Sequence, residues 1–97
     1  MHARVTFANA QPAKVDETIK VMRDSILPAA KKQKGFKGLF YLTNHNTHKG
    51  MVIVLWNTEA DMKATESSGF YREQVAKLVP LLAGQPTLEI YEVSVQG

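Results

Sequence analysis

A run of six residues near the middle of the chain has no polar side chain: Met51-Val52-Ile53-Val54-Leu55-Trp56. Successive side chains of a β-strand point to opposite faces of its sheet, so a strand with one face in water alternates apolar and polar residues. This run does not alternate. We therefore expect a central strand that is buried on both of its faces.

Three further segments have strand patterns. Residues 36–43 are separated from the central strand by a stretch rich in turn-forming residues at 44–50, which predicts a hairpin. Residues 3–8 alternate, with Val5 and Phe7 on one face. Residues 87–95 alternate in the same way and supply the last strand.

Two segments between the strands have the spacing of helices. Residues 15–30 carry apolar side chains at steps of three and four, and Gly35 is a suitable stop for this helix. Pro28 lies inside it, where the missing N–H predicts a kink. Thr58 is suited to cap a second helix, which we expect to be interrupted at residues 67–69.

This βαββαβ order predicts one α+β domain over residues 1–97, a ferredoxin-like fold with four antiparallel strands and both helices on one face. Chains of this length bury only about 60–65% of their unfolded surface, so the core is thin. The helices leave the other apolar face of the central strand uncovered. A second copy of the same sheet is the simplest cover, and we expect a homodimer joined through sheet faces.

Composition narrows the class of protein. Hydrophobic residues make up 44% and charged residues 22%, the balance of a soluble globular chain. No apolar run approaches the ~20 residues of a membrane helix, so no membrane partner is expected. Cysteine is absent, which removes disulfides, thiol catalysis and cysteine-ligated metals. The N-terminus shows no secretory signal, and we expect a cytoplasmic protein.

The polar clusters predict no nucleic-acid, metal or cofactor site. Four lysines within residues 31–37 are favoured there by the helix dipole, and no RNA-binding aromatic motif accompanies them. His45 and His48 have a spacing that suits one metal ion, but they lie in the turn segment without an acidic or cysteine partner. No dinucleotide-binding or phosphate-loop signature is present.

Three short motifs occur together. A late-helix proline in Ile26-Leu27-Pro28 is followed by Lys34-Gly35-Phe36-Lys37-Gly38-Leu39 at the start of a strand. A strand ending in Trp56 passes through Asn57-Thr58-Glu59-Ala60-Asp61-Met62 into a capped helix, which restarts at Gly69-Phe70-Tyr71. Together these motifs resemble the antibiotic biosynthesis monooxygenase (ABM) family of dimeric α+β barrels, over nearly the whole chain.

The resemblance implies a pocket between helices and sheet in each protomer. In the best-known members it implies cofactor-independent oxygenation of a phenolic polycyclic substrate, whose own carbanion reduces O₂. Tyr71 matches a tyrosine of that branch, whereas Ala60 and Ala64 stand in place of its asparagine and tryptophan. In the haem-degrading branch Asn9 lies close to a matching asparagine, but Ala64 and Gln74 replace tryptophan and histidine, so we expect no haem degradation.

Two functions follow as alternatives. The first is a cofactor-independent monooxygenase acting on a small aromatic or polyketide-like molecule, with Asn9 and Tyr71 as catalytic residues that position the oxygenated ring. The second is a non-catalytic dimer that binds an apolar ligand or a partner. Four of the candidate residues also have a structural alternative. Trp56 and Tyr71 are suited to pack in the core, Asn9 to form a turn, and Tyr91 to lie in the dimer interface. The expected substrate-binding residues are Trp56, Phe40, Phe70 and Tyr91.

Overall fold

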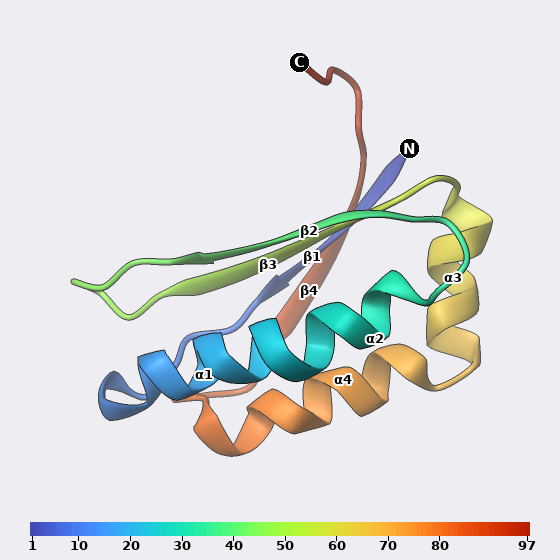
Figure 1. The fold of residues 1–97 in the computed structure, drawn as a ribbon. Coiled ribbons are helices and arrows are strands. Elements are labelled where there is room, and N and C mark those ends of the chain that lie inside the picture. The colour runs from blue at the N-terminus through green and yellow to red at the C-terminus, as the bar shows by residue number, and fades with distance from the viewer.

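The computed structural model describes all 97 residues, in two layers that Figure 1 shows. One layer is an antiparallel sheet with the strand order β2-β3-β1-β4. The other layer consists of helices on one face of that sheet. The strands are β1 (His2–Phe7), β2 (Phe36–Thr43), β3 (Gly50–Trp56) and β4 (Thr87–Glu92). The α-helices are α1 (Val15–Val21), α2 (Leu27–Lys31), α3 (Glu59–Ser67) and α4 (Phe70–Leu78). The predicted ferredoxin-like α+β fold is confirmed.

The apolar strand β3 has a partner on each edge, β2 on one side and β1 on the other, so it is central as predicted. Its alternate residues Val52, Val54 and Trp56 face the helices and line a cavity there. The residues between them face the opposite side of the sheet, where they are half-buried. Hence β3 supplies apolar side chains to both faces of the sheet.

The first helical region is irregular at a different place from the one predicted. Residues 22–26 form a π-turn between α1 and α2, and the N–H of Leu27 donates to the carbonyl of Met22. In a regular α-helix the ring of Pro28 would crowd the carbonyl of Asp24 and leave it without a donor. The wider π-turn immediately before Pro28 accommodates this proline, so the expected kink appears as a π-turn on its N-terminal side.

The second helical region is capped and broken as predicted. The Thr58 hydroxyl accepts a hydrogen bond from the Asp61 N–H at 3.0 Å and caps α3. Gly69 separates α3 from α4 with a φ of +84°, a left-handed conformation that favours glycine. Because of this break α4 runs in a new direction and lies alongside the first helical region in Figure 1.

The main core lies between the two layers, whereas the other face of the sheet carries no helix. Phe40, Leu42 and Tyr91 remain exposed on that helix-free face. None of the helices combines the length and the apolar content that crossing a bilayer requires. The buried cluster of the core consists of Ala8, Met22, Ile26, Val52, Leu78 and Leu82.

Candidate functional site

A small cavity lies between the helices and the sheet, where the family resemblance places a pocket. Its volume is about 50 Å³. A cavity of roughly 150 Å³ holds one benzene ring, so this space as it stands is too small for an aromatic ligand. Eleven of its fourteen lining residues are hydrophobic. The lining consists of Arg4, Thr6, Met22, Ile26, Ala30, Leu39, Val52, Val54, Trp56, Phe70, Tyr71, Gln74, Val75 and Leu78.

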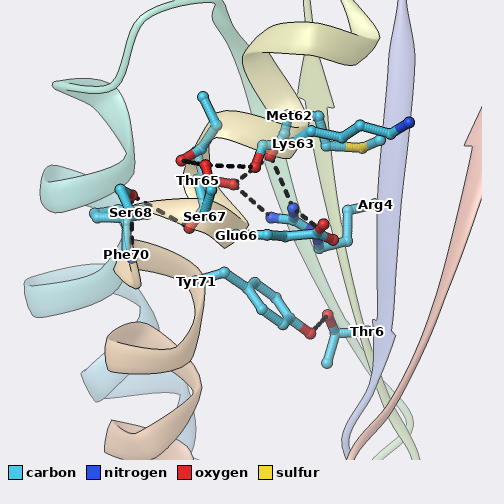
Figure 2. Close-up of polar contacts among 11 residues, drawn as sticks. Arg4, Thr6, Met62, Lys63, Thr65, Glu66, Ser67, Ser68, Phe70 and Tyr71 are labelled. Atoms are coloured by element: carbon cyan, nitrogen blue, oxygen red, sulfur yellow. Dashed lines mark hydrogen bonds and ion pairs between the residues drawn. The ribbon is translucent and has the colours of Figure 1, made fainter.

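Two hydroxyl groups form a pair in the cavity wall. The Tyr71 hydroxyl lies 2.8 Å from Oγ1 of Thr6, and the dashed line between the two residues in Figure 2 marks this hydrogen bond. Tyr71 is held in the first turn of α4, directly after the Gly69 break, and Thr6 points from β1 toward the helices. Each hydroxyl carries one proton and their mutual hydrogen bond uses one, so the second proton remains available for a ligand.

Arg4 is the one charged side chain of the lining and is only 3% exposed. Its Nη1 donates to Oγ1 of Thr65, and its Nη2 donates to the Met62 carbonyl, both at 3.0 Å. Nη2 also lies 3.2 Å from Oε1 of Glu66. The guanidinium carbon is 4.2 Å from the centroid of the Tyr71 ring, a cation–π contact that Figure 2 lets the reader follow. Arg4 thus ties β1 to both α3 and α4.

The charge of Arg4 is only partly compensated. Burial lowers the pKa of the Arg4 guanidinium, and the charge and hydrogen bond of Glu66 oppose this shift. Arginine nevertheless stays protonated at neutral pH, because its pKa starts far above neutrality. The Glu66 side chain is 40% exposed, so water screens its attraction. A buried positive charge therefore borders the apolar cavity.

Two buried donors of the lining lack an acceptor: Nε1 of Trp56 and Nε of Arg4. Trp56 is 1% exposed and packs edge-on against Phe36, with ring centroids 6.1 Å apart. A buried donor without a partner costs about 1–3 kcal/mol. Two residues of the cavity wall therefore each carry a buried N–H group that the protein itself does not satisfy.

Solved structures of other proteins share this architecture over almost the whole chain. A monooxygenase from Streptomyces coelicolor, in complex with nanaomycin D, aligns with a TM-score of 0.71 at 18% identity, over 99% of this chain and 88% of that one. A protein named antibiotic biosynthesis monooxygenase aligns with a TM-score of 0.75 at 10% identity, over 95% of this chain and 97% of that one. The chain has the fold of the antibiotic biosynthesis monooxygenases.

The same ABM fold occurs in a protein of unknown function from Nitrosomonas europaea, with a TM-score of 0.79 at 21% identity over 99% of this chain and 91% of that one. The sequence itself matches no protein-family model and no curated protein. The similarity is therefore one of fold, and the chemistry of the site has to be inferred from the residues of the cavity.

Three of the predicted site residues meet in this ABM fold. Tyr71, Trp56 and Phe70 all line the cavity. Phe40 and Tyr91, expected to bind substrate, lie instead on the helix-free face of the sheet. On that face Tyr91 donates a hydrogen bond to Glu89. The structure thus separates these two aromatic residues from the cavity.

Asn9, expected to act with Tyr71, also lies outside the cavity lining. Its side-chain oxygen accepts a hydrogen bond from the Gly50 N–H at 3.2 Å, and its backbone carbonyl accepts one from the Ala83 N–H at 2.8 Å. Asn9 borders a separate groove beside the β2–β3 hairpin. Its contacts are those of a residue that closes the turn after β1.

The sequence-based hypothesis did not include Arg4 and Thr6, although a signal for them existed. They alternate with Val5 and Phe7 along the first strand, so they share one face. When helices cover that face, its polar side chains are buried and need partners. Gln74, which stands where the haem-degrading branch has histidine, lines the cavity, whereas Ala64 does not. No three His, Cys, Asp or Glu side chains are grouped to hold a metal ion.

Proposed function

We propose that the protein is a monooxygenase that uses O₂ to oxidise a small phenolic molecule held between α4 and the sheet. The observation that carries this proposal is the Thr6–Tyr71 hydroxyl pair in a cavity whose other walls are mostly apolar. Apolar walls bind an aromatic ring, and one polar group fixes its orientation. The fold shared with the Streptomyces coelicolor monooxygenase supports this assignment.

The reaction places little chemical demand on the protein. A phenol that loses its proton is electron-rich enough to reduce O₂. One oxygen atom enters the ring, and the other leaves as water with two hydrogen atoms of the substrate, so the phenol becomes a quinone. The free hydroxyl proton of the Thr6–Tyr71 pair stabilises the negative charge on the phenolate oxygen. The mostly apolar walls reduce the contact of the reactive carbanion with bulk water.

A ligand must displace part of the wall, because a cavity of roughly 150 Å³ is needed to hold one benzene ring. Phe70, Gln74 and Val75 of α4 line the cavity and are only half-buried. The Gly69 break frees the start of α4 from α3. We expect the ring to enter by displacing side chains on this helix.

Oxygen uptake with a panel of one-ring to three-ring phenols tests the proposal. Protein-dependent, saturable uptake with formation of a quinone absorbance band is the expected result. Heat-denatured protein controls for spontaneous oxidation of the phenols. If no phenol is consumed above that control, the monooxygenase proposal is wrong and a non-catalytic binding protein becomes the better conclusion.

We further infer that the working unit is a homodimer joined through the helix-free face. Phe40, Leu42 and Tyr91 leave an exposed apolar surface there, on the side opposite the helices. The half-buried residues of β3 extend this surface across the sheet. A second copy removes these side chains from water.

A further inference from the structure

We propose that the cavity recognises one anionic oxygen of its ligand, through the N–H groups of Trp56 Nε1 and Arg4 Nε. The ligand class is then a small aromatic anion, a phenolate or a carboxylate, in preference to a neutral aromatic molecule. The inference rests on the proposed function for the location of the ligand, and it holds independently of turnover.

The sheet register places Arg4 and Trp56 on the same face of the sheet. Across the β1–β3 ladder, His2 lies opposite Trp56 and Arg4 lies opposite Val54. Arg4 and Trp56 are therefore diagonal neighbours on one face, a spacing of about 7–8 Å that long side chains bridge. Both line the same cavity, and both of these N–H groups are buried without an acceptor.

The remaining contacts of Arg4 fix its guanidinium. Nη1 donates to Thr65, and Nη2 donates to Met62 and lies 3.2 Å from Glu66, so Nε is the one guanidinium nitrogen without an acceptor. The ring of Tyr71 supports one face of the group. A ligand oxygen then meets a donor that is already oriented, which lowers the entropy lost on binding.

The charge of Arg4 favours an anionic ligand oxygen over a neutral one. Arg4 is a buried cation, and its one carboxylate neighbour, Glu66, is substantially exposed. Buried charges are stable when they are paired and hydrogen-bonded. A bridging water would satisfy the two N–H groups but would bring no charge, whereas an anionic oxygen supplies both. The cavity therefore favours the ionised form of a phenol over its neutral form.

The test uses 4-nitrophenol, which titrates near neutral pH and whose anion absorbs visible light. We expect wild-type protein to lower the apparent pKa of the bound probe. 4-Nitroanisole, which has the same ring without an ionisable hydroxyl, should bind at least about tenfold more weakly. Benzoate and benzamide form a second pair that separates a carboxylate from a phenolate ligand. Trp56 is the only tryptophan, so its fluorescence reports binding at this cavity.

Variants assign the effect to the two donors. Arg4→Met and Trp56→Phe should each weaken 4-nitrophenolate binding about tenfold or more and change 4-nitroanisole binding less than about twofold. Lys32→Met removes an exposed cation outside the cavity and should change neither. In the Trp56→Phe variant, which has no tryptophan fluorescence, binding is followed by the absorbance of 4-nitrophenol. If Arg4→Met does not fold, the Trp56→Phe variant and the probe titration with wild-type protein decide.

An unchanged or raised probe pKa, or equal losses for the anion and the neutral analogue, overturns the inference and leaves water as the partner of these donors. Selective anion binding without any O₂ uptake contradicts the proposed function alone. O₂ uptake that persists in both variants, with no preference for the anion, contradicts this inference alone.

Discussion

Tyr71 contributes a hydroxyl and a ring to the cavity, and each has its own partner: the hydroxyl pairs with Thr6, and the ring lies under Arg4. Tyr71→Phe removes only the hydroxyl. We expect kcat for the phenolic substrate to fall about 10²–10³-fold, the usual loss when a donor to developing negative charge is deleted. The free energy of unfolding should fall by no more than about 1–2 kcal/mol, the scale of one hydrogen bond. Oxygen uptake and urea unfolding measure the two quantities.

Tyr41→Phe is the matched control, because the Tyr41 hydroxyl donates to Thr18 at 3.1 Å and lies outside the cavity lining. It should cost similar stability and no activity. Equal losses of activity in both variants would mean that the Tyr71 hydroxyl has no special part in the reaction.

Gly35 has no room for a side chain. Its φ is +82°, and an added Cβ would collide with the Asp61 side chain. Gly35→Ala should therefore lower the free energy of unfolding by about 1–2 kcal/mol from the left-handed backbone alone, and by more if Asp61 cannot move. At Gly84 an added Cβ meets nothing within 4 Å. Gly84→Ala should change stability by less than about 0.5 kcal/mol, and two equal values from thermal unfolding would contradict the argument.

The sequence predicts some site residues and misses others for a physical reason. Tyr71 lies on a helical stripe that periodicity turns inward, and Trp56 lies on a wholly apolar strand that is expected to be buried on either face. Along β2 both Leu39 and Phe40 are apolar, and alternation does not say which of them the helices cover. A register shift between Phe36 and Gly38 adds a further offset, and the structure places Leu39 in the cavity and Phe40 on the other face.

At the scale of elements, Thr58 controls the start of α3, since its hydroxyl satisfies one of the free N–H groups of the first turn. Thr58→Ala should reduce the free energy of unfolding by about 1 kcal/mol. Thr58→Ser keeps a hydroxyl acceptor and should remain close to wild type. Chemical denaturation with circular dichroism distinguishes the two, and an alanine variant as stable as the serine variant would show that the cap contributes little.

The two helix irregularities differ in how far sequence predicts them. The Gly69 break is visible because few residues other than glycine adopt a positive φ. The π-turn before Pro28 cannot be predicted from the sequence, because a helix accommodates a proline either by a bend or by a wider turn. Met22 and Ile26 in that turn are both buried in the core. Whether the helix bends or widens at the proline depends on how these two side chains pack. The same packing sets the volume of the cavity, and the periodicity of the sequence does not determine it.

At the scale of the whole molecule, a charge should have opposite consequences on the two faces of the sheet. Phe40 is 56% exposed on the helix-free face, so Phe40→Lys should leave the protomer folded and abolish the dimer. Val54 faces the helices directly opposite Arg4. Val54→Lys buries a second positive charge beside the first and should prevent folding.

Light scattering with circular dichroism tests this pair of variants. Wild-type protein at micromolar concentration should have twice the 10.8 kDa mass of one chain. Phe40→Lys should give the mass of one chain with an unchanged spectrum. A wild-type mass near 10.8 kDa would contradict the dimer.

The position of β1 in the sheet affects the order in which the strands can pair during synthesis of the chain. β1 is synthesised first, yet it lies between β3 and β4, with His2 opposite both Trp56 and Glu92. Only the β2–β3 hairpin pairs neighbouring segments, and sheets that depend on distant pairings fold slowly. A ribosome must therefore release residues 87–92 before β1 has its second partner. Until then one edge of β1 stays unpaired and can pair with other nascent chains, and chaperones have their opportunity to bind during this interval.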